Sequence, residues 1–133
     1  MLAELKAIHV ELEAAMDELD RLTQDAVPNQ TAVASARARL SKASGKRRGL
    51  FDMACNALGK SATAAEAEKL RQVRELNAAQ LKISTAHIGA WGLRQLVENW
   101  PDYVRTAAPM RQSMRDLIAA DRAVLFPMLE RAP

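Results

Sequence analysis

The feature that most constrains the fold is the spacing of apolar side chains, which follows the period of an α-helix along most of the chain. In residues 2–22 the spacing alternates between three and four residues, at Leu2, Leu5, His9, Leu12, Met16 and Leu19. This pattern places one continuous apolar face along a helix. A chain of such segments folds by packing helices against one another, and the sequence predicts an all-α protein.

Interruptions of this pattern predict the ends of the first two helices. Pro28 ends the first helix, because proline disfavours helical backbone at the preceding Val27. Asn29 or Thr31 can cap a second helix, which runs to about Leu58 and stops at glycine 59.

The second half of the chain predicts two further helices. Thr63 and Glu66 have the spacing of a capping box and start the third helix, which Trp100-Pro101 ends. Its expected apolar face is Leu70, Val73, Leu76, Ile83, Ala90 and Val97. The last helix is expected to begin near Pro109, and Pro127 is expected to bend or fray its end.

Length and composition fit one domain over residues 1–133. Apolar residues make up 49% of the chain and aromatic residues only 4%, a composition typical of helices rather than strands. Four amphipathic helices with short connections favour an up-down-up-down four-helix bundle.

Charge and cysteine content predict a cytoplasmic protein that does not enter a membrane. Glu4 and Lys6 interrupt any apolar leader, and no apolar run reaches the length of a membrane span. A single cysteine, Cys55, cannot form an internal disulfide and is expected to be a small buried side chain.

Residues 86–132 and the sequence LFPMLERA at 125–132 resemble the C-terminal half of hemerythrin-like domains, which are His-His-Glu cation-binding proteins. The opening IHVELEAAMDELDRL, residues 8–22, is similar to the first helix of that family. The resemblance implies a four-helix bundle in which all four helices would hold a pair of metal ions. It also implies that most ligands are missing here: Leu117 and Asp121 stand at the histidine and glutamate positions of the last helix, and Lys42 and Lys46 at those of the second.

The expected remnant is a degenerate metal-site layer of His9, Glu13, Lys42, Lys46, Asn77, Leu117 and Asp121. Lysine does not readily bind a metal ion there, because its ammonium group has no lone pair, so we expect neither a metal nor another cofactor. Lys46 is predicted to pair with Asp121, although Gly45 and Gly49 could shift the helix and bring Lys42 or Arg47 inward instead. In the competing interpretation Glu13 and Lys46 face solvent, and His9 only makes a hydrogen bond in the core.

The cationic stretch in the second helix is a candidate docking face, formed by Arg37, Arg39, Arg47 and Arg48. No aromatic side chains interleave with it, and the net charge is only +3, which argues against nucleic acid as the partner. The candidate partners are therefore an acidic surface of another protein and a second copy of this chain.

His87 invites comparison with histidine phosphotransfer domains, but the lysine that would stabilise a phosphate is missing after it. We therefore expect His87 to be buried between the third helix and its neighbours. It also lies more than about 20 Å from His9 by helical rise, too far for one ion. With no recognisable catalytic motif, the sequence favours a non-catalytic regulatory or protein-interaction module, and the alternative is a residual metal-binding or oxygen-sensing protein with atypical ligands.

Overall fold

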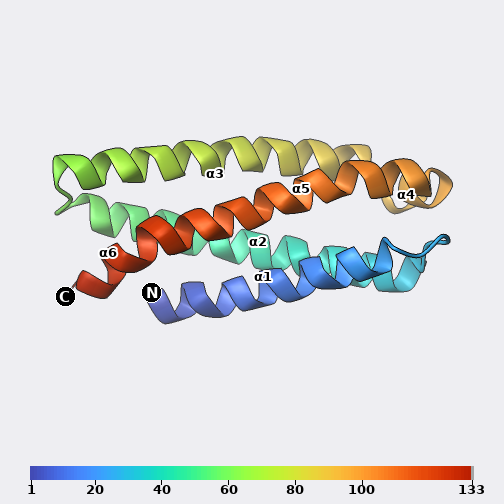
Figure 1. The fold of residues 1–133 in the computed structure, drawn as a ribbon, viewed down its shortest axis with the longest axis horizontal. Helices are drawn as coiled ribbons and strands as arrows, with labels where there is room; N and C mark the ends of the chain where they lie inside the picture. The colour runs from blue at the N-terminus through green and yellow to red at the C-terminus, as the bar shows by residue number, and fades with distance from the viewer. Residues whose placement is uncertain (133) are drawn as a thin grey trace.

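The computed structural model describes residues 1–132, and all regular structure in that range is helical (Figure 1). The elements are α1 (Leu2–Leu22), α2 (Gln30–Gly59), α3 (Ala64–Ala90), α4 (Leu93–Glu98), α5 (Trp100–Ala120), the π-helical turn η1 (Asp121–Leu125) and α6 (Phe126–Arg131). The all-α prediction is confirmed for these residues. Pro133, the last residue of the predicted domain, lies outside them.

The four longest helices, α1, α2, α3 and α5, extend lengthwise along the molecule, and the chain direction reverses from each to the next (Figure 1). α1 packs most extensively against α2, and α3 packs against α5, whereas α2 and α3 make few contacts. The short α4 lies at the end where the chain passes from α3 to α5 (Figure 1). None of the helices in the described range is both long and apolar enough to cross a membrane.

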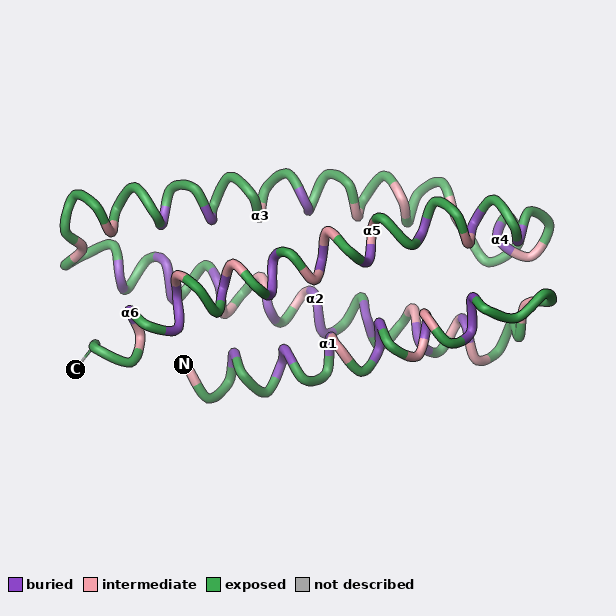
Figure 2. The backbone as a smooth tube through the Cα atoms, in the orientation of Figure 1, coloured by how far each residue is buried: buried purple, intermediate pink, exposed green. Residues whose placement is uncertain are grey.

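The core is formed mainly by α1, α2 and α5. On α1 the predicted apolar face is buried except for Leu2, which is half-buried; Leu5, Leu12 and Met16 are at 0% exposure. Figure 2 shows the buried positions of α1 recurring along one side of the helix, whereas α3 is exposed along most of its length. The helical period of the first segment therefore identified its inner face correctly.

Local capping accounts for the starts of α2 and α3. The Asn29 side chain accepts a hydrogen bond from the Ala32 amide (3.1 Å) and caps α2. At α3 the Thr63 hydroxyl accepts from the Glu66 amide (3.2 Å), and the Glu66 carboxylate accepts from the Thr63 amide (3.0 Å). The predicted capping box is confirmed, and both N-terminal amides have partners.

The prediction for the boundary between the third and last helices is wrong. α3 ends at Ala90, because Trp91 (φ −117°, ψ 68°) and Gly92 (φ −64°, ψ 166°) leave helical geometry. α5 begins at Trp100, and Pro101 lies in its first turn. Proline is tolerated there, because an amide in the first turn has no helical carbonyl to bond and its absence costs nothing. Pro109 lies inside the helix.

The apolar face predicted for α3 is only partly right. Leu70 and Val73 are buried, but Leu76 and Ile83 are 42% and 48% exposed. We define the inner row of α3 as the positions that continue from the buried pair at helical spacing, namely Leu70, Val73, Asn77, Gln80, Ser84 and His87. Leu76 and Ile83 flank this row, because polar residues occupy the positions that face the other helices.

Candidate functional site

A buried arginine on α2 lies at the centre of a hydrogen-bonded cluster. Arg47 is 2% exposed, and its guanidinium donates to both oxygens of Asp121, from Nε to Oδ2 (2.8 Å) and from Nη2 to Oδ1 (2.9 Å). Its Nη1 donates to Oδ1 of Asn77 (2.7 Å). A two-point contact between guanidinium and carboxylate fixes the relative orientation of the two groups as well as their distance.

His9 completes the cluster from α1. Its Nε2 lies 2.9 Å from Oδ2 of Asp121, and because that carboxylate already accepts from Arg47, Nε2 must be the donor. The imidazole stacks on Phe126, with ring centroids 5.3 Å apart and an interplanar angle of 18°. His9 and Asp121 are each 1% exposed, so neither side chain reaches the surface.

The cluster draws one side chain from each of α1, α2 and α3 and one from the C-terminal segment. Arg47 lies on the inner side of α2, one helical turn after the buried Ala43 and one before the buried Phe51. Its guanidinium carbon is 5.0 Å from the centroid of the Phe51 ring, so a cation–π contact supports the same orientation.

A π-helical turn begins at Asp121. The amide of Phe126 donates to the Asp121 carbonyl, five residues earlier. Pro127 has no amide to donate to Ala123, and its ring would crowd that carbonyl in an α-helix, so a widened turn accommodates the proline. The helix then continues to Arg131 instead of fraying, and Asp121 and Leu125 both face the core.

The charges of the cluster balance, since one guanidinium faces one carboxylate. Removing both ions from water is costly, and the cost is offset only if the remaining donors and acceptors are bonded. Here Asp121 accepts three hydrogen bonds, and three guanidinium nitrogens of Arg47 donate. The Nδ1 atom of His9 is the exception, with no hydrogen-bond partner among residues 1–132.

Three residues of the predicted layer, His9, Asn77 and Asp121, are brought together, but the two lysines are not. Lys42 and Lys46 are exposed on α2, and the predicted ion pair between Lys46 and Asp121 is wrong. Arg47, one position further along α2, takes that place because it lies on the inner side of the helix. This is the register alternative that the flanking glycines left open.

The other two predicted members lie elsewhere. Leu117 is 3% exposed and belongs to the apolar core. Glu13 accepts a hydrogen bond from Nη2 of Arg122 (2.9 Å) at the partly exposed boundary between α1 and the C-terminal segment. Glu13 therefore contributes to an ion pair between helices and not to the buried cluster.

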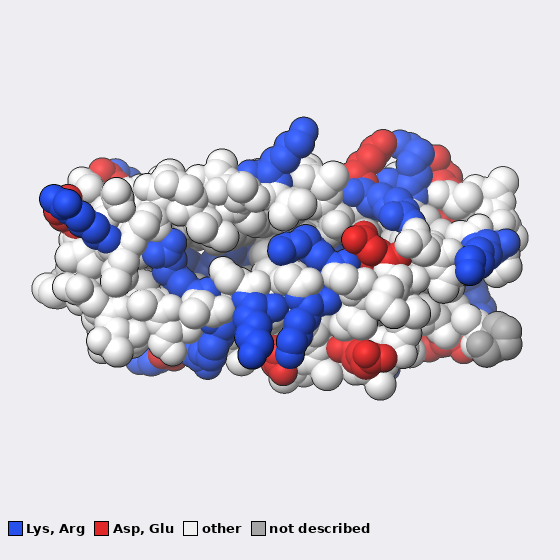
Figure 3. Space-filling view, turned by 180° about the vertical axis from the view of Figure 1, so that it is seen from behind, with Lys and Arg blue, Asp and Glu red and all other residues white. Residues whose placement is uncertain are grey.

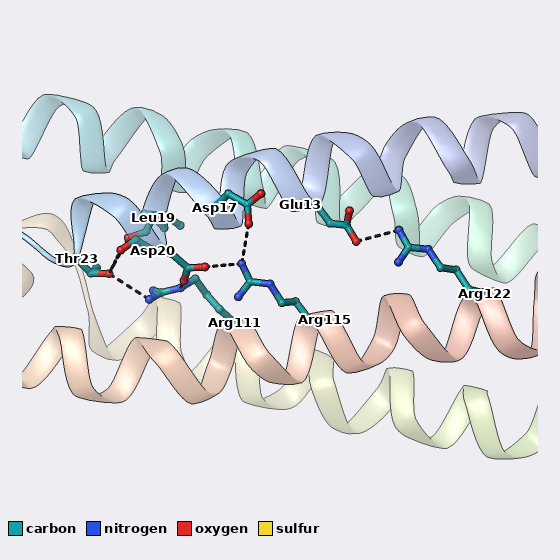
Figure 4. Close-up of polar contacts among 8 residues, drawn as sticks. All are labelled: Glu13, Asp17, Leu19, Asp20, Thr23, Arg111, Arg115 and Arg122. Atoms are coloured by element: carbon teal, nitrogen blue, oxygen red, sulfur yellow. Dashed lines mark hydrogen bonds and ion pairs between the residues drawn. The ribbon is translucent and has the colours of Figure 1, made fainter.

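That ion pair is part of a row of contacts between α1 and the α5–η1 segment (Figure 4). Arg111 donates from Nε to Oδ1 of Asp20 (2.7 Å), and Arg115 donates to Asp20 (2.5 Å) and to Asp17 (3.1 Å). Burial alone would raise the pKa of Asp20, but the hydrogen bonds from Arg115 and Arg111 outweigh it and hold the pKa below its usual value. The row fixes the position of α5 against α1.

The predicted docking face of four arginines does not form one surface. Arg47 is buried, and Arg37 is half-buried and donates to the Trp91 carbonyl, which ties α2 to the end of α3. Arg48 is also half-buried, so only Arg39 of the four is exposed. The residues differ in exposure because a run of consecutive helical positions samples every side of the helix.

His87 is half-buried and Cys55 is buried. His87 is half-buried, less than predicted, and stacks on Tyr103 with ring centroids 5.8 Å apart; burial, and then the charges of Arg37 and Arg111, lower its pKa. Cys55 is 1% exposed, as predicted for a small buried side chain, and burial raises its pKa to about 11.

Within residues 1–132, no three His, Cys, Asp or Glu side chains lie together in a way that could hold a metal ion. In comparisons with known proteins the sequence matches no family model, and neither a curated protein nor a solved structure matches it significantly. Sequence reasoning assigned Arg47 to a docking face; its spacing from Phe51 was the signal that could have marked it as an inward-facing residue.

Proposed function

We propose that the protein is a non-catalytic, hemerythrin-like module with the up-down-up-down bundle arrangement, in which a guanidinium replaces a di-metal centre and which acts by binding another protein. The observation that carries this proposal is the contact between Arg47 and Asp121. The carboxylate stands where the family resemblance implies a metal ligand, and the guanidinium occupies both of its oxygens, at 2.8 and 2.9 Å.

The chemistry of the cluster supports a site without metal. A guanidinium has no lone pair to offer a metal ion, and its positive charge opposes the entry of a second cation. A metal ion could reach Asp121 only by displacing three hydrogen bonds in a region closed to water. Catalysis at this cluster is disfavoured for the same reason, since the carboxylate and imidazole are hydrogen-bonded to each other and buried away from any substrate.

A role in protein binding is supported by the exposed flank of α3. Leu76 and Ile83 are two helical turns apart and therefore lie on the same side of the helix, at 42% and 48% exposure. Apolar side chains aligned in this way can pack against a helix of a partner, which could be another protein or a second copy of this chain.

The test is metal analysis of protein purified from cells grown with added iron, together with thermal melts with and without a strong chelator. We expect a metal content far below one ion per chain and the same melting temperature in both melts, because the cluster is held by hydrogen bonds of its own. A stoichiometric metal content with a melting temperature that falls on chelation would refute the proposal in favour of the metal-binding or oxygen-sensing alternative.

A further inference from the structure

A pocket of about 330 Å³ lies between α2, α3 and α5. It is open to the surface, and Figure 3 shows a hollow on this face with lysine and arginine side chains around it and within it. The volume falls in the range of about 300–1,000 Å³ that is typical of ligand sites. It is also about twice the 150 Å³ of a protein cavity that binds benzene, which corresponds to a ligand of about two rings.

Most of the wall is apolar. Leu40 on α2, Leu81 and Ile88 on α3, and Met114 on α5 contribute to it. Leu81 and Ile88 are 41% and 53% exposed because α3 makes few contacts with α2 here. A ligand with an apolar body would cover these two side chains and remove their apolar surface from water.

The charged part of the wall has one sign. Arg37, Arg48 and Arg111 line the pocket, and none of its lining residues, all within the described part of the chain, is an aspartate or glutamate. Arg48 lies about 16 Å along α2 from Arg37, counting the helical rise, so it belongs to the other end of the pocket.

Arg37 and Arg111 both line the pocket, together with His87 and Tyr103. The guanidinium carbon of Arg37 is 5.8 Å from the centroid of the Tyr103 ring, and His87 stacks on the same ring. Burial, and then the charges of Arg37 and Arg111, lower the pKa of His87. We call these four residues the cationic end of the pocket.

Two buried nitrogens at the cationic end lack partners. Arg111 is 3% exposed, and its Nε and Nη2 donate to Asp20 and Thr23, but its Nη1 has no hydrogen-bond partner within residues 1–132. The Nε2 atom of His87 has none in that range either. Buried polar atoms are almost always hydrogen-bonded, and the two residues that carry these unpartnered nitrogens both line the pocket.

We propose that this pocket binds a small organic monocarboxylate with an apolar body, its carboxylate at the cationic end and its body between Leu81, Ile88 and the apolar wall of α2 and α5. A single negative charge fits, because Asp20 already pairs with Arg111 and leaves the charge of Arg37 to be balanced. The proposal goes beyond the proposed function and does not depend on it, since none of the four residues of the Arg47 cluster lines this pocket.

The test is a calorimetric titration of the protein with each of three compounds: 1-naphthoate, the neutral 1-naphthamide and 1-naphthyl phosphate. We expect naphthoate to bind at least tenfold more tightly than the amide, the factor that one charged hydrogen bond of about 1.5 kcal/mol supplies. Equal affinity for the acid and the amide, tighter binding of the phosphate, or no binding of naphthoate at millimolar concentration would each overturn the proposal.

Matched variants locate the binding. Arg37→Gln is expected to weaken naphthoate binding about tenfold or more, whereas Arg39→Gln, on the same helix but exposed and outside the pocket, is expected to leave it unchanged. Leu81 is partly exposed, so the fold can accommodate the larger side chain of Leu81→Trp. Because the indole fills the pocket, this variant is expected to bind neither the acid nor the amide. Equal losses in the two glutamine variants, or full binding in the tryptophan variant, would place the ligand elsewhere and contradict the proposal.

Discussion

Replacement of Arg47 by methionine is the most direct perturbation of the buried cluster. Methionine keeps most of the length of the side chain but removes three hydrogen bonds, two of them to Asp121. The carboxylate then stays buried at 1% exposure, with only His9 as a partner. Breaking a buried ion pair from one side costs about 3–5 kcal/mol, because the remaining charge has no compensation.

The expected loss can be measured by thermal and urea denaturation. For a chain of this size, each kcal/mol changes the melting temperature by about 4 °C, so Arg47→Met is expected to lower it by about 12–20 °C. Lys46→Met is the matched control: it removes a neighbouring cation that is exposed, and its effect should stay within about 0.5 kcal/mol.

A double-mutant cycle separates an uncompensated charge from a simple packing defect. Arg47→Met combined with Asp121→Leu removes both charges, and we expect this double variant to be more stable than Arg47→Met alone. It should remain about 1–3 kcal/mol below the wild type, because Nε2 of His9 then has no acceptor. Purely additive losses, or equal effects of Arg47→Met and Lys46→Met, would refute the reasoning.

Two further predictions concern His87 and the start of α3. The folded-state pKa of His87 is below its ordinary value of 6.5, so the unfolded chain binds more protons and stability falls as the pH drops below about 6.5. His87→Leu is expected to leave the fold intact, to change the free energy of unfolding by about 1–2 kcal/mol, and to flatten its pH dependence below about pH 6.5; an unchanged pH dependence would contradict this. Thr63→Ala removes one side of the capping box and should cost about 1 kcal/mol in urea denaturation, whereas Ser61→Ala, just outside the helix, should cost little.

The positions of α1, α2 and the start of α3 could be predicted because short-range interactions determine them. The apolar period of residues 2–22, the cap at Asn29 and the pair Thr63 and Glu66 each involve residues within one or two helical turns. The boundary at Trp91 was missed, because Gly92 is the only local signal there and a glycine is also tolerated inside a helix.

Only part of the candidate site could be predicted from the sequence. His9 and Asp121 were recognised by family resemblance, and Asn77 by its place on the third helix. The spacing of apolar residues does not show which of the neighbouring cationic side chains on α2 is buried, because each is polar and each is expected to face solvent. The expectation that polar side chains face solvent also led to the prediction that Leu76, and not Asn77, belongs to the inner row of α3.

Tertiary structure decided between these candidates by supplying partners. Asp121 lies 74 positions from Arg47 in the chain and Asn77 lies 30, and only helix packing brings all three together. A buried charge is tolerated where its hydrogen bonds are made, and those bonds come from other helices. The local sequence therefore determined which segments are helical, while contacts between distant segments selected the one cation of α2 that is buried beside Asp121.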